Sequence, residues 1–485
     1  MSNIEGRAAS AAWWSTVEIL ARSCVQFAVM VILARLLSPE EFGLVAMPLI
    51  FTSIGALLVD SGFGTALIQR QRTTADDETT VFIFAVCAGT LAAGILALAA
   101  PAIATFFAEP RLVDLTRAMA LVLPLGALAS VPDALLTMRL GFRERARAEV
   151  IASMGSGTGA VVLAAEGFGV WSLVWQGVAS VAIRGLLLWL YSEWRPRGRF
   201  RAASFRSLFA FGGYLLLTGL LNAVSMRMQL LLIGKLFSAR ELGYYTLAQN
   251  TQQAPASLMG SILNRVGMPV FASIAADRQK LLGAFRISLR MSMFLFVPCM
   301  FGIALIARPL IELLYGSRWI SAAPIMSILA ISAAIWPIHV LNLAVIGAQG
   351  RSDLLLRVEL IKQLTGIALI VAAAHWGPLA IAYAVLTSGF NGMLVNTYYT
   401  KVLLGYGAMA QLSDQSATLI LSAIAAVVGW ITLQLAPPGA AGMLSAVMAS
   451  AVVYVLLAVI TRNRALAGLR SVMRSFLANG DESAR

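Results

Sequence analysis

Apolar runs of about twenty residues follow one another along this chain, with only short polar breaks between them. Of its 485 residues, 59% are hydrophobic and only 12% are charged, whereas soluble proteins carry about a quarter charged residues. A helix of roughly 20 residues crosses the hydrocarbon core of a bilayer. Because lipid offers the backbone no hydrogen-bond partners, these runs predict an all-α polytopic membrane protein.

About fourteen windows between the polar breaks are long and apolar enough for transmembrane helices. They lie near residues 11–37, 43–68, 80–107, 112–137, 149–166, 169–191, 206–236, 243–270, 283–307, 319–347, 354–375, 377–403, 414–434 and 439–461.

Basic residues are concentrated in alternate loops between these windows, as in RLGFRERAR at 139–147 and RPRGRFR at 195–201. The positive-inside rule therefore predicts that both termini are cytoplasmic, which agrees with an even number of spans. On this orientation most of the net charge of +13 faces anionic lipid headgroups, and no nucleic-acid partner is needed to explain it. Residues 462–485 show the spacing of an amphipathic interfacial helix.

One phrase occurs twice, as RLLSPEEFGLVAM at 35–47 and as KLFSARELGYYTL at 235–247. Each copy ends an apolar run, crosses a polar turn and begins the next run. The turn carries the Ser-x-x-Glu pattern of a capping box, which satisfies free amides at a helix start. The capping residues are Ser38 and Glu41 in the first copy and Ser238 and Glu241 in the second.

Six predicted spans separate the two copies, so both halves of the chain face the same way. This is a parallel repeat about an axis along the membrane normal. It predicts two six-helix lobes around a central cleft, an architecture suited to alternating access, plus two extra helices. The predicted parts are an N-terminal lobe at 1–200, a C-terminal lobe at 201–405, two additional helices at 406–461 and a cytoplasmic tail at 462–485.

Polar residues inside the predicted spans gather in the first two helices of each half. A charge near the centre of a bilayer costs several kcal/mol, so it is a functional candidate. The candidates for substrate binding are Arg22, Gln26, Asn222, Arg227, Asn264 and Arg265, and those for coupling or ion pairing are Glu18 and Asp60.

Arginine side chains on helices that line a cleft favour an anionic cargo. The guanidinium group stays charged away from water and matches phosphate oxygens, so a phosphate or pyrophosphate group is the expected ligand. Structural interpretations remain open, because Glu18 and Arg22 are spaced to neutralise each other along a helix. Asp60 beside a glycine suits a local turn as well as a coupling site.

Residues typical of catalysis or metal binding are few and scattered. Cys24, Cys87 and Cys299 lie in separate apolar runs, and His339 and His375 lie on different predicted spans. No nucleophile–base pair, phosphate-binding loop or metal-ligand spacing occurs. The sequence therefore predicts a transporter with no cofactor and no metal, rather than an enzyme.

The segments ILARLLSPEEFGLVAM at 32–47 and FTSIGALLVDSGFGTALIQRQ at 51–71 carry a family resemblance. The chain resembles the Wzx-type lipopolysaccharide and exopolysaccharide flippases, within the superfamily of multidrug, oligosaccharidyl-lipid and polysaccharide exporters. The resemblance is most specific over residues 13–72 and continues more loosely through LIGKLFSARELGYYTLAQN at 232–250 and GAQGRSDLLLR at 347–357.

This resemblance implies a MATE-like fold and export of an undecaprenyl-pyrophosphate-linked oligosaccharide across the bacterial inner membrane, for lipopolysaccharide, exopolysaccharide or capsule synthesis. It also implies a polymerase and a chain-length regulator of the same pathway as candidate protein partners. Related lipid II flippases carry cavity arginines on helices 1, 2 and 8. Arg22 and Arg265 match the arginines of helices 1 and 8 by their placement. The second predicted helix has no arginine in mid-span, only Asp60 and the terminal Arg70, so Arg227 is the substitute for the third arginine.

Three other functions are alternatives to the flippase. A multidrug or cation antiporter of the same fold would need a site built from buried carboxylates, and the predicted site here is richer in arginine. A membrane-embedded glycolipid polymerase or glycosyltransferase would need large outer loops, which are short here. A non-transporting scaffold of a polysaccharide assembly complex is the third.

Overall fold

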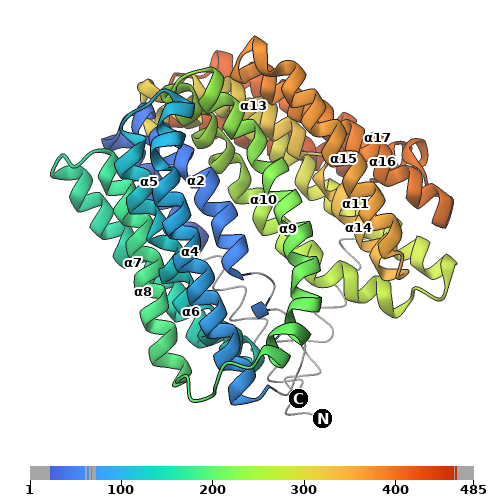
Figure 1. Ribbon diagram of the computed structural model, residues 1–485. Helices are drawn as coiled ribbons and strands as arrows, with labels where there is room; N and C mark the ends of the chain where they lie inside the picture. Colours follow the sequence, from blue (N-terminus) through green and yellow to red (C-terminus); the bar gives the residue numbers. More distant parts are fainter. Residues whose placement is uncertain (1–21, 61–62, 65–66, 68–72, 464, 467–485) are drawn as a thin grey trace, which may run out of the picture. The chain divides into compact units, whose positions relative to one another are not determined.

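The computed structural model describes residues 22–60, 63–64, 67, 73–463 and 465–466, and every regular element in these ranges is a helix (Figure 1). After a helix at residues 22–36 the elements are α2 Pro39–Asp60, α4 Ala75–Phe107, α5 Leu112–Ala120, α6 Val122–Met138, α7 Phe142–Ala165, α8 Val170–Ser192, α9 Ala202–Leu236, α10 Ala239–Ser273, α11 Arg278–Leu305, α12 Ala307–Tyr315, η1 Ser317–Trp319, α13 Ala322–Ala333, α14 Trp336–Ala348, α15 Ser352–Ala373, η2 Ala374–Trp376, α16 Pro378–Leu404, α17 Ala408–Leu435 and α18 Ala440–Ile460.

Ten segments within the described ranges are long and apolar enough to span a membrane, and each coincides with a predicted window. The other four predicted windows, 11–37, 206–236, 243–270 and 354–375, overlap the helix at 22–36, α9, α10 and α15. The prediction of an all-α polytopic membrane protein is confirmed, and the total of fourteen spans stays a prediction.

The chain forms two compact units, Met1–Thr246 and Leu247–Arg485. The first unit holds α2 to α9 and the first two turns of α10, so it extends beyond the predicted N-terminal lobe at 1–200. The four-part division made from the sequence stays a prediction.

In the first unit, α4, α6, α7 and α8 pack side by side (Figure 1). An aromatic cluster fills the end where α4 begins, with Phe82 5.7 Å from Trp189 and 5.3 Å from Trp194 between ring centroids. The indole Nε1 of Trp194 donates to Oε2 of Glu78 at 2.8 Å. The basic segment after α8 is thereby fixed over the start of α4.

In the second unit, α11 is the central element of the core. Phe285 and Leu289 are fully buried on one side of α11 against α14, α16 and the Tyr406 ring. Phe294, on the side facing the last two helices, packs on Tyr454 of α18, whose hydroxyl donates to the Phe294 carbonyl at 2.7 Å. The two extra helices α17 and α18 are thus fixed to α11.

The capping box predicted for the first copy of the repeated phrase is confirmed at the start of α2. The amide of Ser38 donates to Oε2 of Glu41 at 2.7 Å, and the amide of Glu41 donates to the Ser38 hydroxyl at 3.4 Å. In the second copy, the amide of Glu241 donates to the Ser238 hydroxyl at 3.2 Å, which is the serine half of the same motif.

The two copies also pack against each other within the first unit. A methyl group added at Gly43 on α2 would overlap the carbonyl oxygen of Ala239, and one added at Gly243 on α10 would overlap the carbonyl oxygen of Pro39. Only glycine allows two backbones to approach this closely. The glycine in each copy therefore fits against the turn of the other, and we call this contact the glycine joint.

The glycine joint predicts that Gly43→Ala destabilises the folded protein by about 1–3 kcal/mol, because overfilled contacts force the backbones apart. Gly243→Ala should cost a similar amount, since the contact is reciprocal. The measurement is thermal unfolding of the purified protein in detergent.

Gly94→Ala on α4 is the matched control, because a methyl group there would meet no atom within 4 Å. It should leave the melting temperature unchanged or raise it. Equal melting temperatures for Gly43→Ala and Gly94→Ala would contradict the joint.

Candidate substrate site

Five of the eight predicted site residues have no described side chain. Glu18 lies outside the described residues, and Asp60 is the last residue of α2. Asn222 lies on α9, and Asn264 and Arg265 lie on α10. Their roles stay predictions.

The other three predicted residues are described and lie on two helices. Gln26 and Arg22 are exposed on the helix at 22–36, and Arg227 is half-buried on α9. No hydrogen bond or ion pair joins these three to one another in the described part of the chain. Arg22 instead reaches Glu149 on α7, with Nε 3.4 Å from Oε1.

Glu149 belongs to a network of five charged side chains, which we call the inner charge network. Arg184 on α8 contacts Oε2 of Glu149 through Nε at 2.8 Å and Oδ2 of Asp133 on α6 through Nη2 at 3.0 Å. Arg145 on α7 contacts Oδ1 of Asp133 through Nε at 2.7 Å. The order of contacts is Arg22, Glu149, Arg184, Asp133 and Arg145.

Among the residues that the structure describes, the inner charge network carries three guanidinium groups and two carboxylates, an excess of one positive charge. The Arg184 guanidinium contacts both carboxylates, and the Glu149 side chain is only 12% exposed. Arg22 makes the longest contact and its side chain is 49% exposed. A half-exposed pair at this distance contributes little energy. Arg22 is therefore the member most easily turned toward an incoming anion.

Glu149 was not predicted from the sequence as a partner of Arg22. The pairing with Glu18, which lies outside the described residues, stays a prediction, and the described partner of Arg22 is Glu149 on another helix. Two signals were available: Asp133 interrupts the apolar run ASVPDALLTM, and Arg145 and Glu149 are one helical turn apart. Neither reveals which helices meet.

Close packing places Arg22's helix against α7. A methyl group added at Gly157 on α7 would overlap the side chain of Val29, and Val29, Leu33 and Ala160 form one buried cluster. A glycine at this crossing lets the two helices approach closely. The Arg22 and Glu149 side chains meet because of this crossing.

A second set of charges surrounds the glycine joint. The Arg111 guanidinium contacts Glu40 in the first turn of α2 and Glu109 after α4, and Lys235 at the end of α9 donates to the Phe106 carbonyl. The hydrogen bond from Arg111 lowers the pKa of the Glu109 carboxyl. This exposed pair stabilises the fold at neutral pH, and the contribution is lost as pH falls through that lowered pKa.

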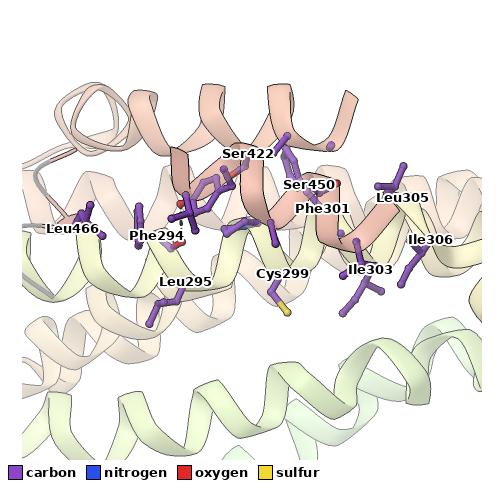
Figure 2. Close-up of a pocket in the computed structure, with 18 residues that line it drawn as sticks. Phe294, Leu295, Cys299, Phe301, Ile303, Leu305, Ile306, Ser422, Ser450 and Leu466 are labelled. Carbon is purple, nitrogen blue, oxygen red and sulfur yellow. Dashed lines mark hydrogen bonds between the residues drawn. The ribbon is translucent and has the colours of Figure 1, made fainter. Parts of the chain in front are cut away.

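An apolar cavity of about 580 Å³ lies in the second unit between α11, α17 and α18 (Figure 2). Leu295, Cys299 and Ile303 of α11 lie along it, and Ser422 and Ser450 approach from the two extra helices. A cavity of this size holds a small ligand or a hydrocarbon chain.

The fold is that of the multidrug, oligosaccharidyl-lipid and polysaccharide exporters. The structure of the lipid II flippase MurJ in its inward closed conformation matches 94% of this chain and 98% of that chain, with a TM-score of 0.75 at 14% identity. An inward-facing multidrug resistance MATE family transporter matches 81% of this chain and 94% of that chain, with a TM-score of 0.59 at 14% identity. At these identities the likeness concerns the fold alone.

Within this class the chain belongs to the family of polysaccharide biosynthesis proteins, whose model matches residues 32–324. This confirms the resemblance to Wzx-type flippases. The succinoglycan biosynthesis transport protein ExoT of Rhizobium meliloti (strain 1021) is 30% identical over 66% of this chain, which spans 65% of ExoT, just under two thirds of its length.

Two further relatives match over longer stretches. The teichuronic acid biosynthesis protein TuaB of Bacillus subtilis (strain 168) is 25% identical over 85% of each chain. The lipopolysaccharide biosynthesis protein WzxC of Escherichia coli (strain K12) is 25% identical over 80% of this chain and 79% of its own.

The inner charge network predicts unequal coupling energies for the two arginines that share Glu149. In double-mutant cycles with Glu149→Gln, we expect about 1–2 kcal/mol for Arg184→Gln, which is hydrogen bonded. For Arg22→Gln we expect below about 0.5 kcal/mol, because that pair is half exposed. Unfolding in detergent measures both, and a larger coupling for Arg22 would contradict the assignment of Arg22 as the available cation.

Proposed function

We propose that this protein flips a polyprenyl-pyrophosphate-linked oligosaccharide repeat unit across the bacterial inner membrane by alternating access. The exported repeat feeds lipopolysaccharide, exopolysaccharide or capsule synthesis. The protein acts as a transporter, not as an enzyme, and its protein partners are a polymerase and a chain-length regulator of the same pathway.

The half-exposed guanidinium of Arg22 is the observation that carries the proposal. It sits at the end of a network with one excess positive charge, in a chain of the polysaccharide biosynthesis family. A pyrophosphate offers more oxygens and more charge than the single Glu149 carboxylate. Arg22 exchanges its weak contact with Glu149 for charge-assisted hydrogen bonds to the lipid head.

In the proposed mechanism the head enters the cleft from the cytoplasmic side, while the polyprenyl tail stays in lipid at a lateral opening. Arg22 and Arg265 bind the pyrophosphate. Arg227 on α9 is the third ligand, in place of the arginine that α2 lacks. Gln26, Asn222 and Asn264 add hydrogen bonds. Rocking of the two lobes then opens the site outward, with Glu18 and Asp60 as candidates for coupling.

The antiporter alternative needs carboxylates that are free to exchange protons or cations. Asp133 and Glu149 in the first unit are held by arginines, and so is Asp414 in the second, where Nη2 of Arg290 lies 2.9 Å away. A carboxylate held by a guanidinium group stays ionised and binds a cation weakly. Among the carboxylates whose side chains the structure describes, these three favour the flippase over the antiporter.

Removing both proposed pyrophosphate ligands tests the mechanism. The double variant Arg22→Gln, Arg265→Gln should reduce export at least tenfold, because each charge-assisted contact contributes about 1.5–3 kcal/mol. Lipid-linked repeats should accumulate on the inner leaflet of cells that carry only this variant. Exported polysaccharide and the sidedness of the glycolipid are measured together.

Arg206→Gln serves as the control, since Arg206 is an exposed cation at the start of α9. It should leave export unchanged at equal expression, and Arg22→Lys should retain more export than Arg22→Gln. Normal export by the double variant would reject a cationic site.

The proposed orientation places residue 462 in the cytoplasm and the α17–α18 turn in the periplasm. A fluorescent protein fused after Arg462 should fluoresce, and alkaline phosphatase fused after Pro438 should be active. The opposite pair of results would overturn the orientation and the number of spans before it.

A further inference from the structure

A polar pocket of about 270 Å³ lies in the second unit beside the apolar cavity of Figure 2. Its lining includes Arg290 of α11, Asp414 and Thr418 of α17, and Arg462 and Asn463 just after α18. The inner charge network and the proposed substrate residues do not contribute to it.

The linings of the polar pocket and the apolar cavity continue into each other. On α17, Thr418 lines the first and Ser422, one turn further, lines the second. After α18, Ala465 lines the first and Leu466 the second. On α11, Arg290 is followed one turn later by Phe294 of the cavity. The two spaces therefore form one amphipathic site.

Positive charge and a free donor characterise the polar end. Asp414 is shared by Arg290 at 2.9 Å and Arg286 at 3.5 Å, so its charge is more than compensated. Arg462 is exposed and forms no ion pair with any residue that the structure describes. The amide Nδ2 of Asn463 is buried without a hydrogen-bond partner among the described residues. This combination fits an anion with several acceptor oxygens.

The apolar end has the length of one bilayer leaflet. Phe294 and Leu305 mark its extent along α11, and the eleven helical steps between these two residues cover about 16 Å. Half of the ~30 Å hydrocarbon core is about 15 Å. An acyl chain whose phosphate sits at Arg290 would fill this length.

We propose that this site binds an anionic phospholipid that stays with the protein. Its phosphate contacts Arg290, Arg462 and Nδ2 of Asn463, and one acyl chain lies in the cavity between α11, α17 and α18. The lipid fills the space between the two extra helices and α11 of the same unit. A polyprenyl carrier fits less well, because its chain exceeds the cavity and an oligosaccharide exceeds the polar pocket.

Native mass spectrometry of the full chain tests the proposal after incubation with phosphatidylglycerol, phosphatidylcholine or undecaprenyl phosphate. Phosphatidylglycerol should be retained at least about fivefold more than phosphatidylcholine, as expected for one added cationic contact. Arg462→Gln should reduce that preference about fivefold. Ala451→Trp, which fills the cavity, should abolish retention of both phospholipids.

Matched controls sit close to each variant. Arg357→Gln removes an exposed cation from α15, and Val452→Trp adds the same bulk at an exposed neighbour of Ala451 that does not line the cavity. Both should behave as wild type. The melting temperature should rise with phosphatidylglycerol in the wild type and the controls but not in Ala451→Trp.

Two results would overturn the proposal. Equal retention of the two phospholipids, or retention unaffected by Arg462→Gln and Ala451→Trp, would show that no phospholipid head is recognised here. Preferential retention of undecaprenyl phosphate that displaces phosphatidylglycerol would assign the site to the polyprenyl carrier. Neither result bears on the Arg22 mechanism.

Discussion

The glycine joint is the contact on which the architecture of the first unit depends. Gly43 and Gly243 each lie against the backbone of the other copy's turn, where any larger residue would collide. The contact pairs equivalent residues of the repeated phrase. Ser38 and Ser238 cap the starts of α2 and α10 at this contact. Arg111 contacts Glu40 in the first turn of α2, and Lys235 at the end of α9 contacts the Phe106 carbonyl.

Each unit contains a cluster in which arginines outnumber the carboxylates they contact. In the first unit three arginines contact the two carboxylates Asp133 and Glu149. In the second unit two arginines contact the single carboxylate of Asp414. Sharing keeps each carboxylate paired, since an unpaired charge in an apolar setting is costly. It also leaves surplus positive charge at two places, which we assign to the pyrophosphate of the cargo and to a bound phospholipid.

The sequence predicted those features of the fold that local patterns determine. The window predicted at 377–403 corresponds to α16, Pro378–Leu404, and the window predicted at 439–461 corresponds to α18, Ala440–Ile460. Glycine and proline mark these helix boundaries through local backbone geometry, which does not depend on how the helices pack. The first capping box was likewise predictable, since its partners are three residues apart.

Contacts between helices were not predictable from these patterns. The pairing of Arg22 with Glu149 depends on how the helix at 22–36 crosses α7, and the joint depends on how α2 meets α10. Periodicity identifies the face of a helix but not the neighbour of that face. For the same reason, assigning Arg265 and Asn264 to the cleft stays a prediction.

Transport by the purified protein in proteoliposomes tests the central claim most directly, that the protein moves its cargo by recognising the pyrophosphate. The assay compares an oligosaccharide linked to a polyprenol through pyrophosphate with the same oligosaccharide linked through a neutral glycosidic bond. Only the pyrophosphate-linked lipid should reach the opposite leaflet faster than in protein-free vesicles. Equal movement of both lipids would contradict the account.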